Sequence, residues 1–331
     1  MTTARQLIAM IRSHAVGDNE RFLSIAEEVA TDAQKAGKTK VADDIHRLLA
    51  NVRSNKEASV TSIRPTPIAK PRGELLGLIK VTYPETRLGD LVLDPDLAKR
   101  ISRIVLEQKE YRALEAHGLQ PRKRFLFSGP PGTGKTMTAS AIAGELSMPL
   151  FTILLDGIIN KYMGESAAKL RLVFDAMLTS RGVYFFDEID ALATSRGSEN
   201  DVGEARRLLT ALLQFLEEDT SRSVIVAATN LRNLLDPAIF RRFQGAFSYA
   251  LPKPDEARRI LRQHLLQFQK ADLDWPAIDV ATAGLSQADL ASAADDAARE
   301  AVLDNGGNLE TDLLIRALRD RTQLHSVDQK Q

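Results

Sequence analysis

The 331-residue sequence contains no cysteine, which excludes disulfide bonds and thiolate metal sites. It also lacks any apolar run approaching the roughly 20 residues that cross a bilayer, and its first residues contain no apolar segment typical of a secretory signal. Lysine plus arginine and aspartate plus glutamate number 44 each, so no overall positive field attracts nucleic acid. These absences favour a cytoplasmic protein with no membrane contact and disfavour a nucleic-acid partner, while a local basic patch stays open.

Residues 1–53 are expected to form three short helices, because their apolar residues recur every three or four positions. Glycines at positions 17 and 37 separate the three segments. We interpret this region either as a folded cap on the main domain or as a docking module for an adaptor or protease. Residues 54–74 follow as a linker, because the stretch 54–72 is polar and contains Pro65, Pro67 and Pro71.

Short apolar strands and helices alternate over residues 75–252. The predicted strands are 125–128, 149–155, 183–187, 224–229 and 246–251, and the predicted helices between them are 135–146, 165–179 and 203–218. Most of these strands are apolar on both faces, as parallel strands covered on both sides are. The fold class is therefore α/β, a doubly wound parallel sheet.

Residues 253–331 are again helical in pattern. Three helices are expected, starting near Pro254, near Ser286 and near Leu309. Ser286 and Asp289 have the spacing of a capping box at the start of the second of these helices. This region is predicted to form a small helical lid domain.

The segment "GPPGTGKT" at 129–136 lies between a predicted strand and a predicted helix. Its three glycines remove the β-carbons that would keep backbone N–H groups from converging on a phosphate, and the helix directs its positive end to the same place. Lys135 would reach the β- and γ-phosphates of ATP, and the Thr136 hydroxyl would bind Mg²⁺. The residues expected to hold the nucleotide are Gly129, Pro130, Pro131, Gly132, Thr133, Gly134, Lys135, Thr136, Met137 and Asp187.

Two further strand ends carry polar groups toward this loop. The strand "YFFDEID" ends in Asp187, a second magnesium ligand, and Glu188, which would polarise the attacking water. Asn230 ends the strand "VIVAATN" and could orient that water from the other side. A phosphate under attack also needs positive charge, and we expect Arg241 or Arg242 to supply it from a neighbouring subunit.

Taken together, these motifs resemble the AAA+ ATPases, within the branch that contains katanin, spastin and the ESCRT-disassembling ATPase. The resemblance covers residues 75–320 and includes "LLDPAIFRRF" and "GLSQADL", the latter similar to the family's G-x-S-G-A-D-L with Gln287 in place of glycine. It implies a ring, usually a hexamer, with ATP between subunits. The family often has a second arginine three residues after the first, and from Arg242 that position is Gly245.

The segment "NKYMGES" at 160–166 is similar to the family's pore loop, with Lys161, Tyr162 and Met163 facing a central channel. The resemblance implies that such side chains grip an extended polypeptide, and that 195–204 forms a second channel loop. The alternative is that Tyr162 and Met163 are buried anchors of a loop.

Three functions remain open from the sequence: an ATP-driven protein translocase, which could feed a separately encoded protease; a nucleic-acid motor or loader; and an ATP-binding assembly switch. The sequence contains neither H-E-x-x-H nor G-x-S-x-G, so no peptidase motif is evident in the chain itself.

Overall fold

The computed structural model describes residues 29–30, 75, 77–158, 165–192, 199–231, 237–268 and 273–328. The chain divides into two compact units, residues 1–68 and 69–331. In the first unit only Val29 and Ala30 are described, and both are helical and buried. The rest of the predicted helical region 1–53 and the linker 54–74 lie outside the described residues, so every strand and the other helices reported below belong to the second unit.

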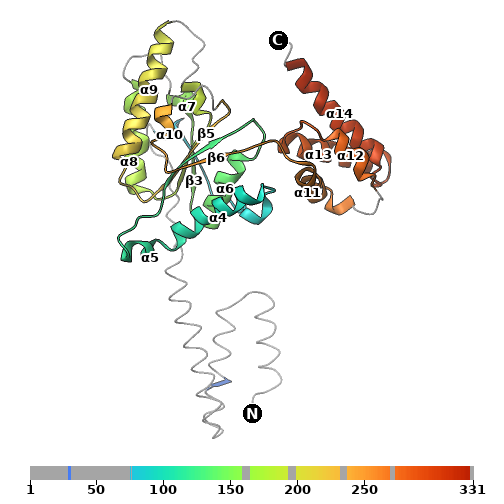
Figure 1. Cartoon of the computed structure of the whole chain (residues 1–331), viewed down its shortest axis with the longest axis horizontal. Helices are drawn as coiled ribbons and strands as arrows, with labels where there is room; N and C mark the ends of the chain where they lie inside the picture. Colours follow the sequence, from blue (N-terminus) through green and yellow to red (C-terminus); the bar gives the residue numbers. More distant parts are fainter. Residues whose placement is uncertain are drawn as a thin grey trace. The chain divides into compact units, whose positions relative to one another are not determined.

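The described part of the second unit contains one six-stranded sheet in the order β1-β3-β4-β5-β2-β6 (Figure 1). The strands are β1 (Ile79–Thr82), β2 (Arg124–Ser128), β3 (Leu150–Ile153), β4 (Val183–Phe186), β5 (Val224–Thr229) and β6 (Gly245–Ser248). All neighbouring strands are parallel except β1 and β3, which are antiparallel. The five parallel strands match the prediction.

The antiparallel edge strand β1 was not predicted, and it adds a sixth strand to the five parallel ones without changing the fold class. β1 has four residues, and only Ile79 among them is buried. Its exposed Lys80 interrupts the apolar run, as is common where an edge strand meets solvent. The sequence therefore gives no clear strand signal before residue 125.

Helices cover both faces of the sheet, and β4 shows how its residues divide between them. Tyr184 and Phe186 pack with helices α8 (Glu165–Thr179) and α9 (Glu199–Glu218). Val183 and Phe185 pack with α4 (Pro95–Lys109) and α6 (Lys135–Glu145) on the other face. Because side chains alternate along a strand, an all-apolar strand contributes to two cores. The doubly wound prediction is confirmed.

The helices at the C-terminal end form a group with its own core (Figure 1). They are α11 (Pro254–His264), α12 (Trp275–Ala281), α13 (Gln287–Asp304) and α14 (Thr311–Asp328). The buried face of α13 contains four alanines, at 293, 294, 297 and 301, whose small side chains allow its neighbours to approach closely. The predicted capping box is confirmed: Ser286 Oγ accepts from Asp289 N–H, and the Asp289 carboxylate accepts from Ser286 N–H at 2.9 Å.

Several predicted boundaries were wrong. The strand predicted at 149–155 ends at Ile153, and Leu155 begins the short helix α7 (Leu155–Ile158). The strand predicted at 246–251 ends at Ser248. Helix α9 begins at Glu199 and not at 203, so residues 199–204 of the predicted second channel loop are helical. Helices α4 and α12 were not predicted, and α12 is only seven residues long.

The remaining described elements are short helical turns: η2 (Leu88–Asp90), α5 (Tyr111–Ala116), η3 (Ile189–Leu192), α10 (Pro237–Phe240) and η5 (Leu266–Phe268).

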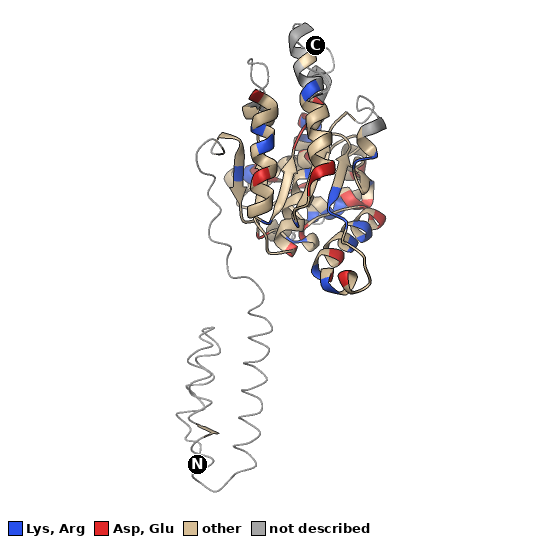
Figure 2. Ribbon diagram, turned by 90° about the vertical axis from the view of Figure 1, so that its left-hand side faces the viewer, with Lys and Arg blue, Asp and Glu red and all other residues tan. Residues whose placement is uncertain are grey.

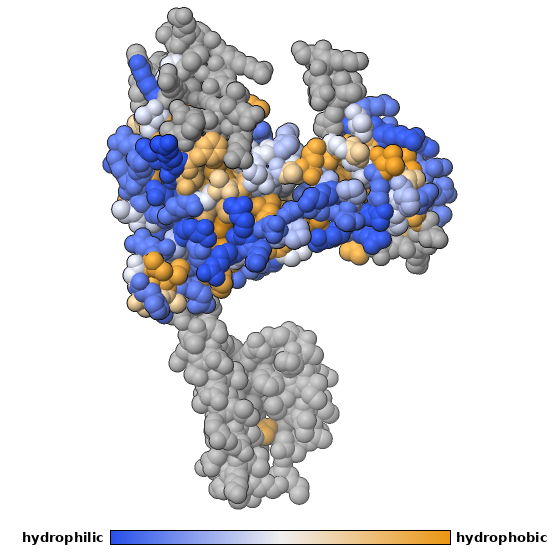
Figure 3. All heavy atoms as spheres, in the orientation of Figure 1, coloured by the Kyte–Doolittle hydropathy of each residue, from blue (hydrophilic) through white to orange (hydrophobic). Residues whose placement is uncertain are grey.

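Charged residues of both signs are interspersed along the second unit (Figure 2). In the view of Figure 3, apolar groups lie as separate patches among hydrophilic ones. No helix among the described residues is long and apolar enough to cross a membrane.

Candidate functional site

The phosphate-binding loop connects β2 to α6, and its glycines are required for two reasons. Gly132 and Gly134 have φ of 72° and 90°, backbone conformations that residues with a β-carbon rarely adopt. A β-carbon at Gly129 would also collide with the carbonyl of Tyr249, and one at Gly132 would collide with Ser286 Oγ. The glycines therefore let the loop pack against neighbouring segments as well as leave its N–H groups accessible, a packing role that the motif alone does not reveal.

Lys135 is the first residue of α6, and its buried side chain forms hydrogen bonds with the loop's own backbone. Its Nζ donates to the carbonyl oxygens of Gly129 and Pro130, at 2.8 Å each. Burial lowers the pKa of Lys135, and the nearby Asp187, Asp190 and Glu188 partly oppose that shift. The ammonium group is thus held by neutral carbonyls beside the place where phosphates would bind.

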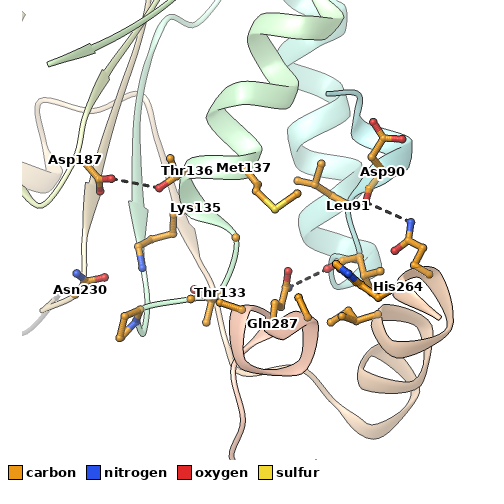
Figure 4. Close-up of a pocket in the computed structure, with 18 of the residues that line it drawn as sticks. Asp90, Leu91, Thr133, Lys135, Thr136, Met137, Asp187, Asn230, His264 and Gln287 are labelled. Atoms are coloured by element: carbon orange, nitrogen blue, oxygen red, sulfur yellow. Dashed lines mark hydrogen bonds between the residues drawn. The ribbon is translucent and has the colours of Figure 1, made fainter. Parts of the chain in front are cut away.

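Thr136 and Asp187 lie together, as their proposed shared role as magnesium ligands requires (Figure 4). Thr136 Oγ1 donates to Asp187 Oδ2 at 3.3 Å, and Asp187 Oδ1 accepts from the N–H of Glu188 at 3.0 Å. Burial raises the pKa of the Asp187 carboxyl, while these hydrogen bonds and Lys135 act in the opposite direction. A hydroxyl and one carboxylate fit Mg²⁺, which completes its octahedron with water and substrate phosphates. No cluster of three His, Asp or Glu side chains that could hold a metal occurs among the residues described.

Glu188 follows β4 in a strained conformation, and Asn230 follows the neighbouring strand β5. Glu188 is exposed and has φ of 51°, which is uncommon for a residue with a β-carbon. The N–H of Asn230 donates to the buried carboxylate of Asp190 at 3.2 Å. No role was predicted for Asp190, although it is the second aspartate of "DEID". Here it links the ends of two adjacent strands beside the pocket.

These residues line one pocket of about 330 Å³. Its lining includes Pro131, Gly132, Thr133, Gly134, Lys135, Thr136, Met137, Asp187, Glu188 and Asn230, all of them predicted. Gly129 and Pro130 act from behind through the carbonyls that hold Lys135. The structure therefore brings the predicted nucleotide-binding residues together around a single cavity.

The other end of the pocket was not predicted. It is formed by Asp90, the last residue of η2, by Leu91 and Val92, which follow it, and by the C-terminal helices (Figure 4). The C-terminal helices contribute Ile260, Gln263, His264, Gln287, Ala288 and Ala291. These residues form no contiguous motif, so the sequence carried no signal beyond the noted substitution at Gln287. A pocket with a glycine-rich anion loop at one end and both apolar and polar side chains at the other suits a nucleotide.

The arginine pair lies away from this pocket. Arg241 and Arg242 follow α10; Arg241 is exposed, and neither lines the cavity. Arg242 Nε lies 2.6 Å from Glu217 Oε1, an ion pair by distance although the N–H is not aligned as in a hydrogen bond. The predicted pore residues Lys161, Tyr162 and Met163 lie outside the described residues, between α7 and α8.

The loop, the Thr136–Asp187 pair and Glu188 define a P-loop nucleotide site on a doubly wound sheet. Residues 125–250 match the family described as "ATPase family associated with various cellular activities (AAA)". The α/β domain is an AAA ATPase domain, which binds ATP with Mg²⁺ and hydrolyses the ATP.

Known proteins similar to this chain extend the comparison. An uncharacterized AAA family ATPase, y4kL, of Sinorhizobium fredii (strain NBRC 101917 / NGR234) is 29% identical over 310 residues, with 93% of this chain and 92% of that protein covered. The proteasome-activating nucleotidase of Methanothermobacter thermautotrophicus is 37% identical over 209 residues, which span 61% of this chain and 51% of the nucleotidase. The crystal structure of the FIGL-1 AAA domain superimposes with a TM-score of 0.61 at 25% identity and covers 81% of this chain and 97% of that domain. The narrower resemblance to the katanin and spastin branch stays a prediction.

Proposed function

We propose that this ATPase is a protein translocase that works as a homo-oligomeric ring, with six subunits as in the family it resembles. The observation that carries the ring is the position of Arg241 and Arg242, which line no part of their own chain's nucleotide pocket. An arginine that stabilises charge on a phosphate under attack must then come from another subunit. The pocket also contains the carboxylate expected of a hydrolytic enzyme, Glu188, which a passive nucleotide switch would not need.

We assign the trans-acting role mainly to Arg241. Arg242 already pairs with Glu217 of its own chain, whereas the Arg241 side chain is exposed. The Arg242–Glu217 pair is itself partly exposed, so it is worth roughly 0–1 kcal/mol and can be broken when subunits assemble. Arg242 would then act as a supporting group in place of the family's second arginine, because the position three residues after Arg241 is Gln244.

We assign the binding and pulling of the polypeptide substrate to the segment that contains Lys161, Tyr162 and Met163. In the sequence this segment lies between helices α7 and α8, and α7 follows β3 at the carboxyl end of the parallel strands, where the phosphate loop follows β2. An aromatic and a thioether side chain can hold a polypeptide through apolar contact that is largely independent of its sequence. A relative named as a proteasome-activating nucleotidase supports delivery to a separate protease. We place the protein in the cytoplasm and assign partner docking to residues 1–53.

Tyr162→Ala tests translocation. The variant should bind ATP, assemble, and keep basal hydrolysis within about a few-fold of the wild type, while unfolding of a tagged fluorescent substrate nearly stops, since about 0.5–1.5 kcal/mol of aromatic contact is lost in every subunit. Tyr162→Phe is the matched control and should keep most of the unfolding activity. Normal unfolding by Tyr162→Ala would refute the assignment. Loss of DNA-stimulated ATPase activity with protein unfolding untouched would favour a nucleic-acid motor.

Mixing experiments test the ring. Arg241→Ala chains should bind ATP but hydrolyse it slowly, and Lys135→Ala chains should bind none. A mixture should recover part of the activity, because some interfaces combine an intact loop with an intact arginine. Full activity of Arg241→Ala chains, or of a monomer at every concentration, would contradict the arrangement.

A further inference from the structure

Gln287 reaches from the C-terminal helices into the nucleotide pocket (Figure 4). It is the first residue of α13, and its Nε2 donates to the carbonyl oxygen of Val92 at 3.0 Å. Its Oε1 would be the nearest atom, at 3.1 Å, to a β-carbon built on Gly134 of the phosphate loop. The side chain therefore lies across the pocket, between the loop and the apolar end.

Leu91 and Val92 lie where the core of the α/β domain meets the core of the C-terminal helices. The side chain of Leu91 packs in the α/β core and that of Val92 packs in the core of the C-terminal helices. The backbone also connects the two parts nearby, because Ala288 N–H donates to the carbonyl of Gly132 at 3.1 Å. The Gln287–Val92 hydrogen bond thus adds a side-chain restraint between the helical group and the α/β domain.

A nucleotide whose phosphates occupy the loop must extend its base over the position of Gln287 to reach the walls formed by Leu91, Ile260 and Ala291. At that end the Val92 carbonyl is occupied by the Gln287 amide. The amino group of an adenine base can donate to the same kind of acceptor, so the base and Gln287 compete for it. A glycine at position 287, as in the family pattern that this chain resembles, would bring no such competitor.

We propose that Gln287 sets the nucleotide affinity of this site, because a bound base displaces its amide from Val92 and so removes one restraint on the C-terminal helices. The inference depends on nucleotide binding alone and is independent of protein translocation. It gives this chain a residue whose loss strengthens binding, the opposite of what a direct ligand of ATP would show.

The test compares Gln287→Ala and Gln287→Asn with the wild-type chain, using calorimetric titration with ADP and with pyrophosphate. Alanine has no amide, and the asparagine amide is one methylene too short to reach Val92. Both variants should bind ADP about fivefold more tightly, the equivalent of one hydrogen bond of about 1 kcal/mol. Pyrophosphate fills only the loop, so its affinity should not change.

Gln267→Ala is the matched control, because Gln267 is an exposed glutamine in η5 that does not line the pocket. It should leave both affinities unchanged. Weaker ADP binding by Gln287→Ala would show that Gln287 contacts the nucleotide directly, and equal changes for ADP and pyrophosphate would show a general effect on the loop. Either result overturns the proposal, as does unchanged ADP affinity.

A second measurement follows the restraint itself. The chain has no cysteine, so dyes can be attached at Lys99→Cys in α4 and Arg319→Cys in α14, both exposed. ADP should change the energy transfer between the dyes in the wild-type chain, and Gln287→Ala without nucleotide should reproduce part of that change. Identical transfer in the two nucleotide-free proteins would contradict the proposed restraint.

Discussion

Two lysines bracket strand β2, and their surroundings differ. Lys123 precedes the strand, and its Nζ donates to Asp219 Oδ2 at 2.6 Å and to the carbonyls of Asp219 and Ser221. Lys135 follows the phosphate loop at the other end, and its Nζ donates to two backbone carbonyls. Among the described residues, no carboxylate forms an ion pair with Lys135. One cation is neutralised within the fold, and the other is kept for a ligand.

The same difference is seen around each lysine, at the two ends of the central strand β2. Near Lys123, Arg122 pairs with Glu107 and Arg222 pairs with Glu115. At the other end of β2, Lys135 donates to the carbonyls of Gly129 and Pro130, and Asp187, Asp190 and Glu188 act on its charge without forming an ion pair with it. Ion pairs neutralise charges that have only a structural role, whereas the cation of a site that binds a polyanion is left without a direct ion-pair partner. Substitutions near Lys123 should therefore change the stability of the fold, and substitutions near Lys135 should change nucleotide binding or hydrolysis.

The largest effect is expected from Lys135→Ala. The loop would keep its backbone N–H groups but lose its one cation, so binding of fluorescent ATP should fall below detection. The melting temperature should stay close to that of the wild type, because no counter-charge is left unpaired. A variant that still binds ATP with wild-type affinity would show that Lys135 is not needed for nucleotide binding.

Glu188→Gln should come next in size. The amide cannot accept a proton from the attacking water, so hydrolysis should slow by about 10²–10⁴-fold. ATP should still bind, because Thr136 and Asp187 remain, and this variant should hold bound substrate for identification by pulldown. Turnover at the wild-type rate would show that Glu188 is not the base.

Lys123→Met should damage stability and leave the site intact. The Asp219 side chain is only 2% exposed, and loss of the Lys123 ammonium group leaves this buried carboxylate without its ion-pair partner. We expect a loss of about 3 kcal/mol in the free energy of unfolding, measured by urea titration. Nucleotide affinity of the folded fraction should be unchanged. A loss of ATP affinity as large as that of Lys135→Ala would mean that the two ends of β2 are not independent.

The smallest effect concerns Glu107 and Arg122. The hydrogen bonds from Arg122 lower the pKa of the Glu107 carboxyl, which therefore stabilises the fold above its ordinary pKa and loses that contribution as the pH falls through the lowered value. Glu107→Gln should cost less than about 1 kcal/mol at neutral pH, because Arg122 is partly exposed. The difference between variant and wild type in thermal melts should disappear in acid. A difference that persists there would indicate packing and not charge.

Local signals in the sequence predicted the five parallel strands and the phosphate loop, because each depends on residues that are close together in the chain. Lys135, Thr136 and Asp187 could be placed together once the strand order was assumed. The Gln287–Val92 contact joins residues 195 positions apart, and no periodicity or motif encodes it. β1 was missed because its four residues read as a polar edge. The roles assigned to Arg241, Tyr162 and residues 1–53 stay predictions.

The order of the strands also bears on how the chain acquires its fold during synthesis. β2 carries the phosphate loop and, among the described strands, pairs with β5 and β6, whose residues come about a hundred positions later. Contacts so distant along the chain form late, because a long loop must close first. A ribosome would thus finish the loop sequence well before any strand exists to flank it. A nascent chain that ends before β5 should be unable to hold ATP, and this delay gives chaperones an interval in which to bind the exposed apolar residues of β2.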